Sequence, residues 1–300
     1  MSLPRRSTFF HYKPPLTEKN LPSQQGKVFI ITGASSGIGK ELASILYAHH
    51  AKIYLATRAE AKTNAVIDEI RRLNPQNPRS GFLARESRLD VLWNNAAVMV
   101  PPKGSVSVQG HELQFAVNNL GHFLFTKLLH PLLVKTANSE GAAGRRGTVR
   151  VIWVSSSAAD HVAIPAIDFS NMDYRRRGEG IWSMYARSKA GNVLQAVEYA
   201  RRVGEEGVLS LTLNPGNFLT GLQKTMPRWQ VFLFKLVAQD PKNGAYSELF
   251  AGLDESITQA DNGGWVSPYG KLESVREDLL DPVLGKRFWE WCEEKVRDFM

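Results

Sequence analysis

The feature that most constrains this chain is a glycine-rich turn, TGASSGIG, which spans Thr32–Gly39. It lies directly between an apolar run, KVFIIT, and a stretch with helical apolar periodicity, Ile38–His49. A turn from a strand into a helix points backbone N–H groups and the positive end of the helix dipole at a phosphate. Gly33 permits the tight turn, Gly37 lets a ligand approach the backbone, and Gly39 lets the helix pack closely on the sheet. The turn therefore predicts a site for a dinucleotide pyrophosphate.

Short apolar runs alternate with helix-period stretches along the chain. Strands separated by helices form a parallel sheet that is covered on both faces, so the predicted fold class is α/β with a doubly wound parallel sheet. Residues 1–25 predict an irregular N-terminal arm. Residues 26–300 predict a single dinucleotide-binding and catalytic domain, with a substrate loop and C-terminal helices from about residue 218. We expect strands over Lys27–Thr32, Lys52–Arg58, Leu89–Asn95, Thr148–Ser155 and Val208–Gly216, and helices over Ile38–His49, Ala61–Leu73, Glu112–Val134 and Tyr185–Val203.

The charge of the chain is basic but not concentrated. A net charge of +8 could suit a polyanion, yet no dense Lys/Arg stripe accompanies it. The sharpest clusters are Arg175–Arg177 and Arg145–Arg146. We therefore expect a small-molecule partner and no nucleic acid.

The composition also argues against disulfides, membrane spans and metal sites. The single cysteine, Cys292, excludes a disulfide within the chain and favours a reducing compartment. No apolar run approaches the roughly 18 residues of a membrane span, and the longest candidate, Trp229–Ala238, contains Lys235. The histidines have no ligand-like spacing with each other or with Cys292. These observations predict a cytoplasmic protein without a metal site.

The end of the second expected strand indicates which cofactor the turn holds. An acidic residue at this point accepts the adenosine ribose hydroxyls of NAD, whereas a cation favours the 2′-phosphate of NADP. The strand ends at Thr57–Arg58, without Asp or Glu, and Lys62 follows Glu60. Arg58 therefore favours NADP(H).

A tyrosine and a lysine lie four residues apart in YARSK, which places Tyr185 and Lys189 on one face of a helix. A phenol with a pKa near 10 is a poor proton-transfer group at neutral pH. A neighbouring lysine cation stabilises the phenolate and lowers that pKa. The run VSSS adds a hydroxyl at the carboxyl end of the fourth strand, where ligands bind in open α/β sheets. Asn118, in the helix before that strand, could hold a water or a carbonyl that relays protons to Lys189.

Together with NNAAVM, HELQFAVNNLGHF and LNPGNFLTGL, these motifs resemble the short-chain dehydrogenase/reductase superfamily. Within it, the chain is most similar to retinol-dehydrogenase-like reductases of filamentous fungi. The resemblance runs from about Leu16 to Val296 and implies a Rossmann-type fold.

The resemblance implies a catalytic tetrad. Tyr185 is the proton donor to a carbonyl, Ser156 orients and polarises the substrate oxygen, and Lys189 binds the nicotinamide ribose. Asn118 anchors the proton relay. Ser156 is the second residue after the valine of VSS, and its two serine neighbours are rivals for the role. The expected cofactor residues are Gly33, Ser35, Ser36, Gly37, Ile38, Gly39, Arg58, Asn95, Tyr185, Lys189, Pro215, Gly216 and Thr220.

The sequence departs from the family pattern in two places. Ala97 stands where the family has the glycine of NNAG, so a methyl group lies beside the expected cofactor site. Between Arg58 and Asn94 only one helix and the linker NPQNPRSGFLARESR fit, where the family has a further helix and a third strand ending in an adenine-binding Asp. In the strand order 3-2-1-4-5-6 that missing strand is an edge, so its loss breaks no interior pairing. We expect a doubly wound sheet that lacks this third, edge strand.

These features support an NADPH-dependent carbonyl reductase, or the reverse alcohol dehydrogenase, that acts on a small lipophilic molecule. Secondary metabolism is the expected context, and a monomer or homodimer the expected state. The alternative is a catalytically impaired or non-catalytic nucleotide-binding homologue, because the adenine end is shortened. A nucleotide-sugar epimerase or dehydratase is a third reading, and the TGxxxGxG spacing argues against it.

Overall fold

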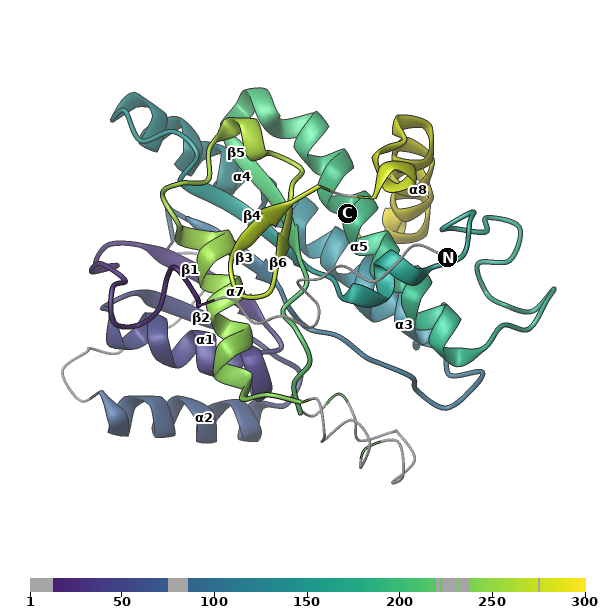
Figure 1. Ribbon diagram of the computed structural model, residues 1–300, viewed down its shortest axis with the longest axis horizontal. Helices are drawn as coiled ribbons and strands as arrows, with labels where there is room; N and C mark the ends of the chain where they lie inside the picture. The colour runs from purple at the N-terminus through teal and green to yellow at the C-terminus, as the bar shows by residue number, and fades with distance from the viewer. Residues whose placement is uncertain (1–12, 75–85, 220–221, 223–230, 232–237, 275) are drawn as a thin grey trace.

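Seven strands form one sheet at the centre of the molecule (Figure 1). The computed structural model describes residues 13–74, 86–219, 222, 231, 238–274 and 276–300. The strand order is β2-β1-β3-β4-β5-β6-β7, and neighbours pair in parallel except β6 and β7, which are antiparallel. The strands are β1 Val28–Thr32, β2 Lys52–Ala56, β3 Val91–Asn94, β4 Val149–Val154, β5 Val208–Leu213, β6 Trp265–Ser267 and β7 Lys271–Glu273.

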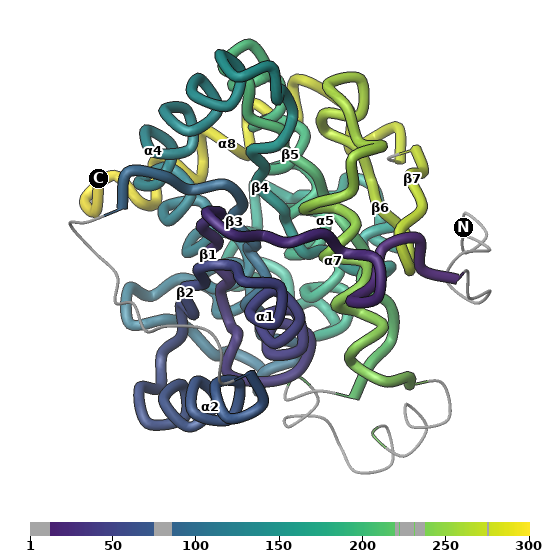
Figure 2. The backbone as a smooth tube through the Cα atoms, turned by 90° about the vertical axis from the view of Figure 1, so that its left-hand side faces the viewer, coloured from purple at the N-terminus to yellow at the C-terminus, as the bar shows by residue number. Residues whose placement is uncertain are grey.

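Helices cover both faces of this sheet (Figures 1 and 2). Side chains of β1, β3 and β4 alternate between two buried clusters, as the period of a strand requires. One cluster packs against α1, α2 and α7, and the other against α4, α5 and α8. The α-helices are α1 Gly37–Ala48, α2 Glu60–Leu73, α3 Leu113–Phe115, α4 His122–Ala142, α5 Ile181–Val203, α7 Pro241–Leu253 and α8 Pro282–Val296. A π-helical segment, η2, spans Ala116–Gly121, and 3₁₀ segments span η3 Ser157–His161, η4 Gly204–Glu206, η6 Gln259–Asp261, η7 Glu277–Leu280 and η8 Arg297–Phe299.

The prediction that the sheet lacks its third strand is confirmed for the residues that the structure describes. β2 is the edge of the sheet, and all five of its residues are only partly buried, whereas β1 is buried throughout. Tyr54 packs on one face of β2, and its hydroxyl donates to the Glu86 carboxylate, which also pairs with Lys52. Residues just before β3 thus occupy part of the face that the missing helix would cover. The linker segment 75–85 lies outside the described residues.

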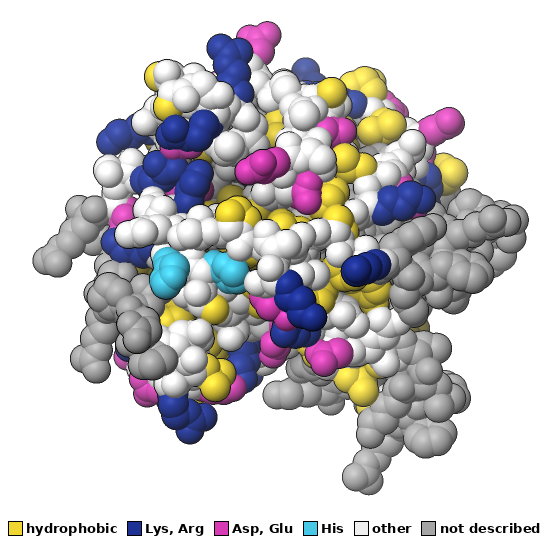
Figure 3. Space-filling model, turned by 60° about the vertical axis from the view of Figure 1, so that its left-hand side comes forward, with side chains coloured by type: hydrophobic (Ala, Val, Ile, Leu, Met, Phe, Trp, Pro, Cys, Tyr) yellow, Lys and Arg dark blue, Asp and Glu magenta, His cyan; other side chains and the backbone are white. Residues whose placement is uncertain are grey.

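A buried ion network closes the shortened connection at the amino end of β3. Asp90 accepts hydrogen bonds from the Val28 N–H at 2.9 Å and from Arg88 Nε at 2.7 Å. The Glu140 carboxylate accepts a hydrogen bond from Arg88 Nη2 at 2.8 Å and another from Arg145 Nε at 2.7 Å. The hydrogen bond from Arg145 is the main reason that the pKa of Glu140 falls to about 2. On the face shown in Figure 3, basic side chains are likewise accompanied by acidic ones.

The structure corrects several predicted elements. The helix expected over Glu112–Val134 begins at Leu113, passes through the π-helical η2 and continues to Ala142, with Pro131 inside it. The helix expected from Tyr185 begins four residues earlier, at Ile181. Strands β6 and β7 extend the sheet within the part that was expected to hold only a loop and helices.

The N-terminal segment has no helix or strand between residue 13 and β1, where the structure describes it. It crosses the molecule in Figure 2 and buries Leu16 and Leu21 in the cluster beneath α1 and α7. Glu18 accepts hydrogen bonds from Lys242 at 2.9 Å and from the Tyr246 hydroxyl at 2.7 Å. The arm is therefore a packed part of the domain.

The described residues hold neither a membrane-spanning helix nor a cluster of metal ligands. Among these residues, no helix has the length and apolar character needed to span a bilayer. Nor, in the same part of the chain, do three or more His, Cys, Asp or Glu side chains gather as a possible metal site. Most of Trp229–Ala238 lies outside the described residues.

Candidate active site

The glycine-rich turn joins β1 to α1 at the carboxyl edge of the sheet. Gly33 has a φ of +70°, and a Cβ there would lie 2.8 Å from the Cα of Ala96. A Cβ at Gly39 would lie 2.5 Å from the Asn95 Nδ2 atom. Both positions therefore exclude larger residues, because the turn and the residues after β3 are in close contact. Gly37 begins α1 with a φ of +59°.

Thr32, at the end of β1, ties the turn to the residues after β3. Its Oγ1 accepts the backbone N–H groups of Asn95 at 2.9 Å and Ala96 at 2.8 Å. The Asn95 side chain returns a hydrogen bond to the Thr32 carbonyl at 2.8 Å. Asn95 is thus held along the cleft where the sequence predicts it, and Thr32 positions it, a role that the sequence did not indicate.

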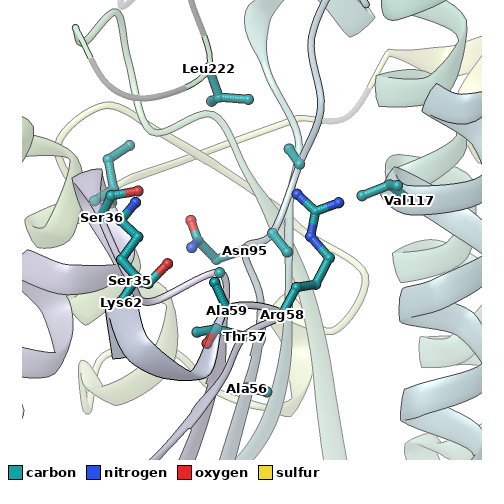
Figure 4. Close-up of a pocket in the computed structure, with 14 residues that line it drawn as sticks. Ser35, Ser36, Ala56, Thr57, Arg58, Ala59, Lys62, Asn95, Val117 and Leu222 are labelled. Atoms are coloured by element: carbon teal, nitrogen blue, oxygen red, sulfur yellow. The ribbon is translucent and has the colours of Figure 1, made fainter. Parts of the chain in front are cut away.

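A cleft of about 440 Å³ opens in front of this turn (Figure 4). Polar groups on its lining include the Ser35 and Ser36 side chains and the cations of Arg58 and Lys62. Ser36 is the N-cap residue of α1, but its side chain makes no capping hydrogen bond. The remaining lining is Gly33, Ile38, Ala56, Thr57, Ala59, Asn95, Ala96, Ala97, Val117 and Leu222.

The cleft fits a phosphorylated dinucleotide in its chemistry. Hydroxyls and a helix N-terminus suit a pyrophosphate, and Arg58 with Lys62 supplies positive charge. No Asp or Glu belongs to the described lining, so an acid that would accept ribose hydroxyls is missing there. Lys62 joins the expected Arg58 because the first turn of α2 carries it back to the end of β2.

A second cavity of about 230 Å³ adjoins the cleft and shares Ile38, Asn95, Ala97 and Leu222 with it. Its lining brings together the predicted Ser156, Tyr185, Lys189, Pro215 and Gly216, from three different segments of the chain. The methyl group of Ala97 therefore lies at the junction of the two cavities. Thr220 lies outside the described residues. Further residues on this lining are Met99, Val154, Ser155, Ser157, Ala158, His161, Trp182, Asn217 and Phe218.

Among the three adjacent serines, the geometry separates Ser156 from its neighbours. The Ser155 hydroxyl is buried and donates to the Lys189 carbonyl at 2.7 Å. Ser156 makes a side-chain hydrogen bond with Tyr185, and its Oγ accepts the Ala158 N–H at 3.2 Å. Ser157 begins the 3₁₀ segment η3. Of the three serines, Ser156 is therefore the one whose hydroxyl lies within hydrogen-bond distance of the Tyr185 hydroxyl.

Burial dominates the electrostatics of Tyr185 and Lys189. It raises the pKa of the Tyr185 phenol to about 12, against the hydrogen bond from Ser156, which lowers it. The sequence predicted that a neighbouring lysine lowers this pKa, whereas burial raises it. Burial also lowers the pKa of Lys189 to about 7. Its Nζ donates to the Val154 carbonyl at 2.8 Å and lies 5.9 Å from the centre of the Tyr185 ring.

Asn118 lies in the π-helical segment η2 and is fully buried. Its side chain accepts the Val98 N–H at 2.9 Å and donates to the Val98 carbonyl and the Ser188 hydroxyl, each at 3.0 Å. The Asn118 carbonyl receives Asn192 Nδ2 at 2.7 Å. Asn118 therefore ties the residues after β3 to the helix that carries Tyr185 and Lys189.

His122 links Asn118 to the glycine-rich turn. Its Nδ1 lies 3.1 Å from the Asn118 carbonyl oxygen, and its Nε2 lies 3.1 Å from Thr32 Oγ1. Burial, together with the charge of Lys189, lowers the pKa of His122 to about 3. A neutral ring with Nδ1 as donor and Nε2 as acceptor satisfies both contacts.

Comparisons with known proteins agree with this arrangement. A family model described as short chain dehydrogenase matches residues 27–167. The chain is 45% identical to the short-chain dehydrogenase/reductase pkfC of Emericella nidulans, over 97% of this chain and 99% of that protein. The alignment extends over 315 residues, which exceeds the 300 residues of this chain, so the relative has residues without a counterpart here.

Two solved structures share the fold. One is the 3-ketoacyl-(acyl-carrier-protein) reductase of Brucella melitensis complexed with NADH, at 20% identity and a TM-score of 0.58, covering 81% of this chain and 97% of that one. The other is the RhlG/NADP complex of Pseudomonas aeruginosa, at 20% identity and a TM-score of 0.60, covering 81% of this chain and 95% of that one.

Proposed function

This chain belongs to the short-chain dehydrogenase/reductase family, and we propose that it is an NADPH-dependent carbonyl reductase, or the reverse alcohol dehydrogenase. The observation that carries the proposal is the second cavity, where Ser156, Tyr185 and Lys189 meet beside the cleft for a dinucleotide. The lining of that cavity is largely apolar, which supports a small lipophilic substrate. Since the relative is fungal, secondary metabolism is the context that we propose.

NADP(H) is the cofactor that the cleft favours. Arg58, just after β2, and Lys62, in the first turn of α2, place two cations on the lining, which suits a 2′-phosphate, and no carboxylate on the described lining competes for ribose hydroxyls. The NADH and NADP complexes of the two structural neighbours do not decide the matter, because a likeness at 20% identity concerns the fold alone. When bound, the nicotinamide would supply the hydride.

In this proposal the residues of the chain hold the carbonyl oxygen and supply its proton. The Tyr185 hydroxyl donates the proton, since a phenol with a pKa of about 12 is protonated at neutral pH. The Ser156 hydroxyl lies beside the Tyr185 hydroxyl and would donate a hydrogen bond to the same substrate carbonyl oxygen. The ammonium of Lys189 would stabilise the phenolate that the transfer leaves behind.

The test is to give the purified protein NADPH or NADH with a panel of aldehydes and ketones, and to follow oxidation of the cofactor. We expect NADPH to be consumed faster than NADH, and Tyr185→Phe to abolish the consumption. A Tyr174→Phe variant is a matched control, because it removes a phenol hydroxyl that lies on neither cavity and has no hydrogen-bond partner among the described residues. A folded protein that binds NADPH but turns over nothing on the panel would contradict the proposal.

The exposed edge β2 and the missing adenine-binding acid favour a second candidate, an impaired homologue that holds nucleotide weakly. Calorimetric titration with NADP⁺ distinguishes the two. Binding in the micromolar range supports the reductase. The absence of binding by a folded preparation supports the impaired homologue.

A further inference from the structure

Trp182 is an exposed indole on the lining of the second cavity. Its side chain is 44% exposed, whereas Trp93, Trp153, Trp265 and Trp289 are buried in the core. A large aromatic side chain left in water forgoes the free energy that burial would provide. Its position on a cavity lining therefore suggests a ligand that covers it.

The helix places this indole next to the proposed proton donor. Trp182 lies three residues before Tyr185 on α5, so both side chains project from one face. Their ring centres are 6.4 Å apart, with planes at 87°. Because Tyr185 also bonds Ser156, a carbonyl held by that pair would lie on the same cavity lining as the indole.

An apolar cluster borders Tyr185 on this lining, which also carries the polar side chains of His161 and Asn217. Met99 and Leu222 pack in one cluster with Tyr185, and Phe218 borders the same cavity. A methionine and a leucine suit a ring face but offer no charge to a polar substituent. Two exposed planar rings border this cavity, Trp182 and His161, and the indole is the larger and the more apolar of the two.

From this geometry we propose that Trp182 is a specificity-determining residue that selects planar, conjugated carbonyl compounds over saturated ones of the same size. The proposal rests on the proposed function, because it assumes that the carbonyl binds at Tyr185 and Ser156. Offset stacking or edge contact between rings favours an aromatic ligand by up to about tenfold beyond its apolar area.

The experiment compares acetophenone with cyclohexyl methyl ketone, which differ in the planarity of the ring. Binding is measured by calorimetry on the wild-type chain saturated with NADP⁺, which has no hydride to give, so neither ketone is consumed. We expect acetophenone to bind about tenfold more tightly. Trp182→Leu should bring the ratio of the two dissociation constants to about one, and Trp182→Phe should keep most of the preference.

The matched control is Phe299→Leu, which removes an exposed aromatic ring near the end of the chain. It should leave the ratio unchanged, and circular dichroism should show each variant folded. Equal affinity of the wild type for the two ketones, an unchanged ratio in Trp182→Leu, or binding of neither ketone would each overturn the proposal.

Turnover separates this inference from the proposed function. A ring preference that depends on Trp182, in a protein that never oxidises NADPH with either ketone, would support the binding site and contradict the reductase. If Tyr185→Phe abolishes the oxidation of NADPH and Trp182→Leu does not change the ratio of the two ketone affinities, the reductase is supported and the role of Trp182 is contradicted.

Discussion

Replacing Glu248 by glutamine should stabilise this protein at neutral pH and have little effect near pH 4.5. Glu248 lies on α7, facing the sheet, and its side chain has no exposed surface. Neither carboxylate oxygen has a hydrogen-bond partner among the described residues. Burial without a partner disfavours the charged form and raises the pKa of Glu248 to about 8.

The direction and size of the effect follow from the two pKa values. Below the ordinary value of 4.5 both the folded and the unfolded chain hold the proton, so ionisation costs no stability. Between that value and about 8, only the folded chain holds it, and the free energy of unfolding falls by about 1.4 kcal/mol per pH unit. By pH 7 the accumulated loss is roughly 3 kcal/mol, and above the folded pKa it levels off. Glutamine does not titrate, so the variant lacks this loss.

The assay is urea denaturation of both proteins at several pH values between 4.5 and 7.5, followed by circular dichroism. The difference in free energy of unfolding should grow by roughly 3 kcal/mol in favour of Glu248→Gln between pH 4.5 and 7. Other titrating groups cancel in this difference, and Glu290→Gln on the exposed side of α8 is a matched control. A difference that does not change with pH would refute the reasoning, because it would mean that Glu248 is ionised or partnered in the folded protein.

Three further variants test the cofactor cleft and its neighbour. Gly39→Ala should weaken NADPH binding at least tenfold in a calorimetric titration, because its Cβ would meet Asn95; Gly180→Ala, where nothing lies within 4 Å, should not. Arg58→Glu should reverse the preference between NADPH and NADH in kcat/KM, and an unchanged preference would remove Arg58 from the site. Since burial lowers the pKa of Lys189 to about 7, ketone reduction should slow as the pH rises above that value. Lys189→Met should flatten this pH profile and lower kcat about 100-fold or more, and a profile that keeps its shape would contradict the assignment.

Much of the fold could be predicted from periodicity, because a parallel sheet buries whole apolar runs such as VFIIT in β1. The missing edge strand was also predictable, since the spacing between Arg58 and Asn94 leaves no room for it. Strand β6 was not predicted, because Trp265–Ser267 is only three residues long and its pairing with β5 is a tertiary contact. The π-helical segment that contains Asn118 has no sequence pattern that distinguishes it from an α-helix. The sequence therefore predicted one continuous α-helix through it.

In the candidate site, motif spacing was sufficient for residues on one element, such as Tyr185 and Lys189. Residues that tertiary packing brings to the site were missed: Lys62 and Trp182 line the cavities, and Thr32 holds the residues after β3. The pKa of Tyr185 was expected to be lowered, but burial has the opposite and larger effect. The burial of a single side chain depends on the whole fold, so its effect on a pKa cannot be predicted from a local sequence pattern.

The most direct test of the central claim is the transfer of a label to a ketone. The protein is incubated with acetophenone and NADPH that carries deuterium on the transferred position of the nicotinamide, and the product alcohol is examined by mass spectrometry. We expect deuterium on the carbinol carbon with the wild type and none above background with Tyr185→Phe. Equal label in the two proteins, or no labelled alcohol from a folded wild type that binds NADPH, would contradict it.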